Sequence, residues 1–179
     1  NSNDQLFRLV RDLPYGISGG GGILLALRLL DQAGVAGSSA LLHQLLLQFR
    51  PERLLADEGV DLIGGVTGLI GPLLLINTPE CLDLAIACGD RLVELQTKSG
   101  GWSPSVSGPS GRRPALTGFS HGAAGMAAAL ARLAQASGEA RFAEAAQRAV
   151  AYERSVFIGD QGNWPDFRSS NEPNEFMLS

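Results

Sequence analysis

Apolar residues recur along this chain at the spacing of an α-helix, and they do not alternate as they would in a β-strand. Three stretches carry apolar side chains at intervals of three and four residues, with polar residues between them. Alanine and leucine far outnumber β-branched residues, which weakens any prediction of strands. The pattern therefore predicts an all-α protein with amphipathic helices that have polar outer faces. The apolar stripes are Leu42, Leu45, Leu46 and Phe49; Cys81, Leu84, Cys88, Leu92 and Leu95; and Phe142, Ala145, Ala146, Ala149 and Val156.

Three further segments open with glycine and continue into helices that have few polar positions. They span residues 16–30, 61–76 and 118–133 and alternate with the amphipathic stretches. A helix that is apolar on most sides is buried on most sides. The alternation of a buried helix with an amphipathic one predicts a degenerate internal repeat of helix pairs, with loops of different length. The glycines that align the three segments are Gly22, Gly68 and Gly125.

Such helix pairs predict two layers, with the buried helices inside and the amphipathic helices outside. A closed ring of pairs is an α/α toroid, and three pairs make only an arc of one. We therefore expect residues 1–179 to form a single partial domain. An open arc leaves apolar faces uncovered at its ends, so we also expect self-association through these edges.

Composition and charge exclude several classes of partner. The chain of 179 residues has a formal net charge of −4 and no basic stripe, so nucleic acid is not an expected ligand. The longest nearly apolar run, residues 64–76, is too short and too rich in glycine to span a bilayer. Two cysteines cannot build a disulfide framework, which favours a reducing compartment.

His121 is the first candidate for chemistry, because it directly precedes the third glycine-started helix. A helix N-terminus disfavours the imidazolium form, so a neutral ring near pH 7 would be able to exchange protons. The same histidine could ligate a metal, or it could simply bond a loop carbonyl. The pattern leaves the functional and the structural interpretation equally open.

Asp61 holds the comparable place in the second segment, ahead of Gly64 and Gly65. An acid there is an ordinary helix N-cap, but if it faces His121 it can orient the imidazole and set its tautomer. We expect Gly64, Gly65 and Gly122 to line a cavity at the helix N-termini, where unpaired N–H groups favour an anion. Tight helix packing would explain the same glycines.

Other conspicuous residues carry weaker signals. Cys81 and Cys88 lie two helical turns apart on an apolar stripe, so core packing is favoured over a metal site. His43 flanks a stripe and is expected at the surface. Trp102 and Trp164 stand in irregular stretches, where they either line a groove or anchor a loop.

Several motifs together resemble the cyclase domain of type 2 lanthipeptide synthetases, the bifunctional LanM enzymes. The segment "GFSHGAAGM" is followed by "SGEARF", "AYERSVF" and "GNWPDFR", and it is preceded by "DLIGGVTGLI" and "GGW" in the expected order. The resemblance covers the chain from about Tyr15 onward. Any one of these motifs is weak, whereas their combination is specific.

The resemblance implies an α/α toroid around a zinc site in a bacterial cytoplasmic enzyme. This zinc-dependent lanthipeptide cyclase adds cysteine thiols of a precursor peptide to dehydroalanine or dehydrobutyrine, forming thioether rings. The family's motif histidine corresponds to His121, with an acid or base role, and its motif aspartate corresponds to Asp61. The implied partners are the precursor peptide and the remainder of the synthetase.

The sequence departs from the family pattern in one respect. The family's zinc ligands lie in a "WCHG"-like and a "CHG"-like motif, and this sequence contains neither before Ser179. The dehydratase domain that precedes the cyclase is also missing. We therefore interpret the chain as the N-terminal half of a cyclase domain. The parent domain is expected to bind zinc, and the isolated chain to bind none and to be inactive.

Two other functions remain as alternatives. A non-catalytic helical-repeat module that binds a peptide or protein needs neither zinc nor a reactive His121. A different α/α-toroid enzyme, such as a glycoside-processing one, needs two carboxylates that face each other. Asp61 alone is well placed for that role by the sequence, so this alternative ranks last.

Overall fold

The computed structural model describes residues 12–103 and 114–168, and seven α-helices lie within them. The same residues contain no strand, although an isolated β-bridge joins Ile158 and Asn163. The all-α prediction is confirmed. The helices are α2 (Gly20–Gln32), α3 (Ser38–Leu46), α4 (Pro51–Leu55), α5 (Thr67–Ile76), α6 (Pro79–Leu95), α7 (Ala123–Ser137) and α8 (Ala140–Val156), followed by the short 3₁₀ helix η1 (Gly159–Gln161).

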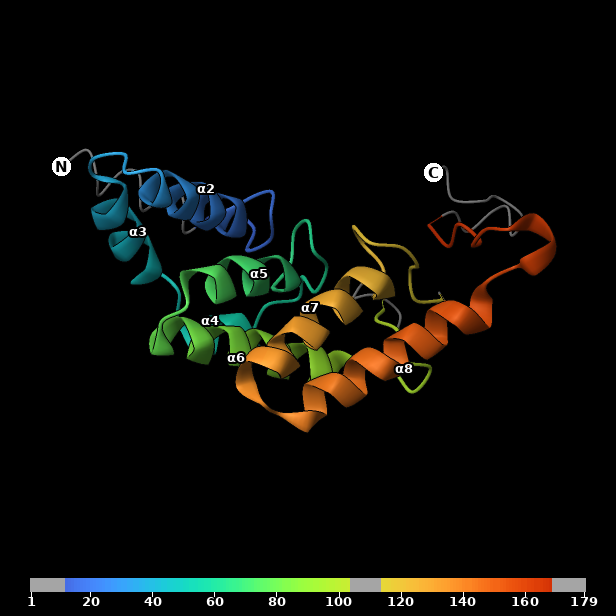
Figure 1. Ribbon diagram of the computed structural model, residues 1–179. Coiled ribbons are helices and arrows are strands. Elements are labelled where there is room, and N and C mark those ends of the chain that lie inside the picture. The colour runs from blue at the N-terminus through green and yellow to red at the C-terminus, as the bar shows by residue number, and fades with distance from the viewer. Residues whose placement is uncertain (1–11, 104–113, 169–179) are drawn as a thin grey trace.

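The helices form successive pairs, as the repeat predicted. Helix α2 packs against α3, α5 against α6, and α7 against α8. The first members of the pairs also contact one another, because α5 lies between α2 and α7. Figure 1 shows the pairs following each other from the blue α2 and α3 to the orange α7 and α8. The helix-pair arrangement of a toroid arc is therefore present.

The core lies where the two members of each pair meet. Each predicted stripe supplies side chains to it, with Leu45, Leu92 and Phe142 at most 1 % exposed. The last residues of the second and third stripes, Leu95 and Val156, are only partly buried but still pack against the core, whereas Phe49 at the end of the first stripe is buried. The three-and-four spacing thus identified the inward faces of the outer helices correctly.

The first inner helix is less buried than its sequence suggested. Helix α2 buries Gly20, Gly21 and Leu24, whereas Leu29 and Leu30 are 51 % and 44 % exposed. The cause is position, since α2 has α3 and α5 as its neighbours and lies at the end of the inner layer. Self-association through this apolar face stays a prediction.

Helix α5 is apolar at nearly every position and is buried between its neighbours. Its ten residues span about 15 Å at the α-helical rise, which is about half the thickness of a bilayer core. Within the described ranges, none of the helices is both long and apolar enough to cross a membrane. The apolar character of α5 is explained by its central place in the inner layer.

Candidate functional site

The loops that precede the three inner helices lie side by side at one end of the inner layer. The middle loop joins the other two through its backbone: the Ile17 N–H donates to the Leu62 carbonyl at 3.0 Å, and the Leu62 N–H donates to the Ser120 carbonyl at 3.2 Å. The three glycine-rich segments therefore do converge in space. Side chains of the middle loop and of the loop before α7 meet at this junction.

Two of the three glycines expected at the site are required by close backbone approach. A Cβ on Gly65 would lie 2.3 Å from the carbonyl carbon of Gly59, and a Cβ on Gly122 would lie 2.1 Å from that of Thr117. No side chain fits at either position without moving the loop. Gly64 differs, because a Cβ there meets only ordinary van der Waals contact. Loop packing therefore explains Gly65 and Gly122.

This difference predicts opposite outcomes for two neighbouring substitutions. Gly65→Ala is expected to lower the free energy of unfolding by about 1–3 kcal/mol, because the loop must shift to admit the methyl group. Gly64→Ala is expected to change it by about 0.5 kcal/mol or less. Urea unfolding of both variants measures the two values. Equal stability of the two variants would show that the middle loop is not tightly packed at Gly65.

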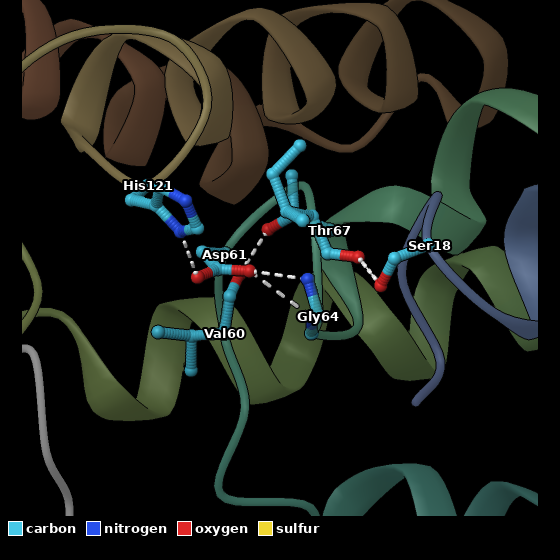
Figure 2. Close-up of polar contacts among 8 residues, drawn as sticks. Ser18, Val60, Asp61, Gly64, Thr67 and His121 are labelled. Carbon is cyan, nitrogen blue, oxygen red and sulfur yellow. Dashed lines mark hydrogen bonds and ion pairs between the residues drawn. The ribbon is translucent and has the colours of Figure 1, made fainter. Parts of the chain in front are cut away.

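Asp61 and His121 face each other across this junction (Figure 2). The His121 Nδ1 lies 2.7 Å from the Asp61 Oδ2, and the side chains are 50 % and 27 % exposed. The other carboxylate oxygen, Oδ1, accepts the backbone N–H groups of Gly64 at 2.7 Å and Gly65 at 3.2 Å. Both oxygens of Asp61 are therefore engaged, and its orientation toward the imidazole is fixed.

The contact determines which ring nitrogen of His121 remains available. An ionised carboxylate is only an acceptor, so Nδ1 carries a hydrogen that it donates to Asp61. The second nitrogen, Nε2, is then free to take up and release a proton. An imidazole held in one tautomer by a carboxylate is the arrangement of a general acid or base.

The interpretation of Asp61 as the N-cap of the following helix is wrong. Helix α5 begins at Thr67 and its N-cap residue is Val66. Asp61 instead closes a turn ahead of the helix through its bonds to Gly64 and Gly65. The turn that Asp61 closes with Gly64 and Gly65 holds the carboxylate next to the imidazole of His121.

A polar cavity of about 350 Å³ opens beside His121. The Asp166–Arg168 ion pair forms part of its wall, and the hydrogen bond from Arg168 holds the pKa of Asp166 below its usual range. Thr117 also lines the cavity, and its buried Oγ1 has no hydrogen-bond partner among the described residues. The remaining lining residues are Leu116, Phe119, Ser120 and Phe167.

A larger cavity of about 730 Å³ lies along α2, α5 and α7. Its lining is mainly apolar and includes neither Asp61 nor His121. His121 lines the smaller, polar cavity, with Asp61 behind it, and we place the candidate site there.

The described residues do not provide a metal site. No group of three or more histidine, cysteine, aspartate or glutamate side chains in residues 12–103 and 114–168 is placed to hold an ion. Cys81 and Cys88 are free thiols that are buried in the core, and burial raises the pKa of Cys88 strongly. Their assignment as packing residues is confirmed, and the residues present do not fit a zinc ion.

The remaining predicted residues have structural roles. His43 is exposed on α3, as expected. Trp102 is 2 % exposed and donates from Nε1 to the Leu92 carbonyl at 2.8 Å, so it anchors its loop. The Trp164 ring contacts the Phe157 ring in a tilted arrangement, with centroids 4.7 Å apart and planes at 59°, and it also lines an apolar groove between α7 and α8. Both interpretations of Trp164 therefore apply.

Four residues close to His121 were not predicted from the sequence. Thr117, Asp166 and Arg168 carry no pattern that marks them as cavity residues. Glu153 did carry a signal, because it occupies a position on the apolar stripe of α8, three residues before Val156. A charged residue on a buried stripe indicates a specific partner.

The comparison with known families gives one match. A family model described as "Lanthionine synthetase C-like protein" matches residues 10–176, which is nearly the whole chain and includes both members of the pair. A search of the curated proteins finds no match.

Proposed function

Because the chain belongs to the lanthionine synthetase C-like family, we propose that it is part of the cyclase domain of a bifunctional LanM-type lanthipeptide synthetase. The proposed reaction adds cysteine thiols of a precursor peptide to dehydroalanine or dehydrobutyrine. The observation that carries this proposal is the 2.7 Å contact between Asp61 and His121 beside a polar cavity. The proposed location is the bacterial cytoplasm.

The proposed reaction requires a proton to be moved. The thiol loses its proton, sulfur forms a bond to the β-carbon, and the electron pair of the C=C bond shifts toward the α-carbon and its carbonyl. A proton must then reach the α-carbon, so that one S–H and one C=C become one C–S and one C–H. His121 Nε2 is suited to take a proton from the thiol and to deliver a proton to the α-carbon. Asp61 stabilises the imidazolium that forms between these steps.

The polar cavity suits a peptide substrate. Its wall combines the polar side chains of Asp166 and Arg168 with the apolar Phe119 and Phe167, so it offers contacts both to the main chain and to the side chains of a peptide. We propose that the segment carrying the dehydrated residue lies there, with its α-carbon toward His121. The precursor peptide and the remainder of the synthetase are therefore the proposed partners.

Zinc belongs to this proposal only through the parent enzyme. The described residues offer no ligand set for it, so we assign no zinc ligand among them and propose that other parts of the synthetase supply the ligands. Bound zinc would lower the pKa of the substrate thiol. The isolated chain is accordingly proposed to be inactive.

The proposal is tested by the fate of the substrate thiols. The complete synthetase, incubated with a dehydrated precursor peptide, should remove thiols that react with an alkylating reagent while leaving the peptide mass unchanged. Omitting the enzyme controls for spontaneous cyclisation. If the peptide binds and its thiols stay reactive, the non-catalytic peptide-binding module is the correct description and the cyclase proposal fails.

A further inference from the structure

Glu153 is a buried carboxylate that bonds to the loop carrying His121. It lies on α8 with 7 % exposure, and its Oε1 accepts two backbone N–H groups, from Gly118 and from Ala124, each at 2.9 Å. These two residues stand on either side of His121. A single side-chain oxygen thus binds the loop both before and after the histidine.

Burial of this carboxylate is costly, and its bonds offset the cost. Burial raises the pKa of Glu153, whereas the hydrogen bonds from Gly118 and Ala124 act in the opposite direction. The first turn of α7 has no side-chain cap from its own sequence, because its N-cap residue is Gly122. Glu153 therefore satisfies a helix N–H group that would otherwise lack a partner.

The loop that carries His121 is closed by two backbone hydrogen bonds, from Ala123 to the Leu116 carbonyl at 3.0 Å and from Gly125 to the Gly118 carbonyl at 3.4 Å. The His121 side chain is half exposed, and its described polar contact is the one to Asp61. On the side of the middle loop, the Ser120 carbonyl accepts the Leu62 N–H at 3.2 Å. On the side of α8, the support comes from Glu153. These two supports place the closed loop relative to its neighbours, so the distance between the imidazole and Asp61 depends on them.

Glu153 is itself held in place. The Trp164 Nε1 donates to the Glu153 main-chain carbonyl at 2.9 Å, which ties the end of α8 to the segment that continues to Asp166 and Arg168. The same segment walls the polar cavity. Glu153 thus connects, through its side chain and its main chain, the loop of His121 and the segment that follows α8.

We propose that Glu153 is a positioning residue that holds the loop from Gly118 to Ala124 so that His121 meets Asp61. This inference rests on the proposed cyclase function. In this role, the rate depends on where the Glu153 Oε1 acceptor lies and not on the negative charge of the carboxylate. Misplacing a reacting group by about 1 Å lowers a rate by up to about 10²-fold.

Two conservative variants separate acceptor position from charge. Glu153→Gln keeps the Oε1 acceptor at the same distance from the backbone and removes the charge. Glu153→Asp keeps the charge and retracts the acceptor by one methylene. We expect the Gln variant to retain kcat within about twofold, and the Asp variant to lose about 10- to 100-fold in kcat with KM unchanged. Glu144→Asp, at an exposed position of α8, is the matched control and should change neither constant.

The kinetics are measured in the complete synthetase with a dehydrated peptide, alongside His121→Asn and thermal unfolding of every variant. Full kcat in the Asp variant, or equal losses in the Asp and Gln variants, would overturn the positioning role. Unfolding of the Asp variant where the Gln and control variants remain folded would also overturn it, since Glu153 would then serve stability alone. If His121→Asn retains full activity, the failure lies in the proposed function itself.

Discussion

Replacing His121 with asparagine is expected to lower kcat for thioether formation by about 10²- to 10⁴-fold, the range in which a general acid or base contributes. An asparagine amide can still donate to the Asp61 carboxylate, but it cannot exchange a proton near neutral pH. KM should stay close to its original value, because the substitution leaves the cavity wall otherwise intact. Disappearance of alkylatable peptide thiols measures the rate.

The other histidine of the chain provides the control. His43 is exposed on α3, so His43→Asn should leave kcat unchanged. Folding should be retained in both variants, because a partly exposed polar contact such as Asp61–His121 contributes no more than about 1 kcal/mol. Undiminished cyclisation by His121→Asn would remove this histidine from the chemistry and favour a peptide-binding module.

Replacing Asp61 with asparagine is the second large effect that we expect. The asparagine Oδ1 can still accept the N–H groups of Gly64 and Gly65, so the turn is preserved. Its amide now donates to His121 Nδ1, which forces the ring hydrogen onto Nε2. That tautomer cannot take a proton at Nε2, and kcat should fall by about 10²- to 10⁴-fold.

Asp90→Asn is a matched control. It removes the charge of a partly exposed carboxylate that pairs with Arg141 on another helix. Its kcat should not change. Urea unfolding should give the same stability for Asp61→Asn as for the original protein, within about 1 kcal/mol. A kcat within twofold of the original would show that the tautomer of His121 is not set by Asp61.

The helix pairs were predictable because the spacing of apolar residues within each helix depends only on neighbouring positions in the sequence. The stripe that includes Phe142 and Ala149 follows the period of a helix and is buried as that period requires. The exposure of Leu29 and Leu30 was not predictable in the same way, since it depends on which helices lie beside α2. Local periodicity gives the faces of a helix, whereas its neighbours decide how many of them are covered.

The candidate site was predictable in part. Asp61 and His121 occupy comparable places in two repeats, and the resemblance to a known family singled out both. Their 2.7 Å contact required the loops to lie side by side, which the sequence alone does not specify. Glu153 was missed although it interrupts an apolar stripe, because its two partners lie 35 and 29 residues away in the chain.

The most direct test of the central claim, that Asp61 and His121 act as one proton-transferring unit, is a double-mutant cycle on kcat in the complete synthetase. The four enzymes are the original protein, Asp61→Asn, His121→Asn and the double variant. If the pair acts as a unit, the double variant loses no more activity than His121→Asn alone, because the aspartate works through the imidazole. If the two losses multiply, the residues act independently and the account is contradicted.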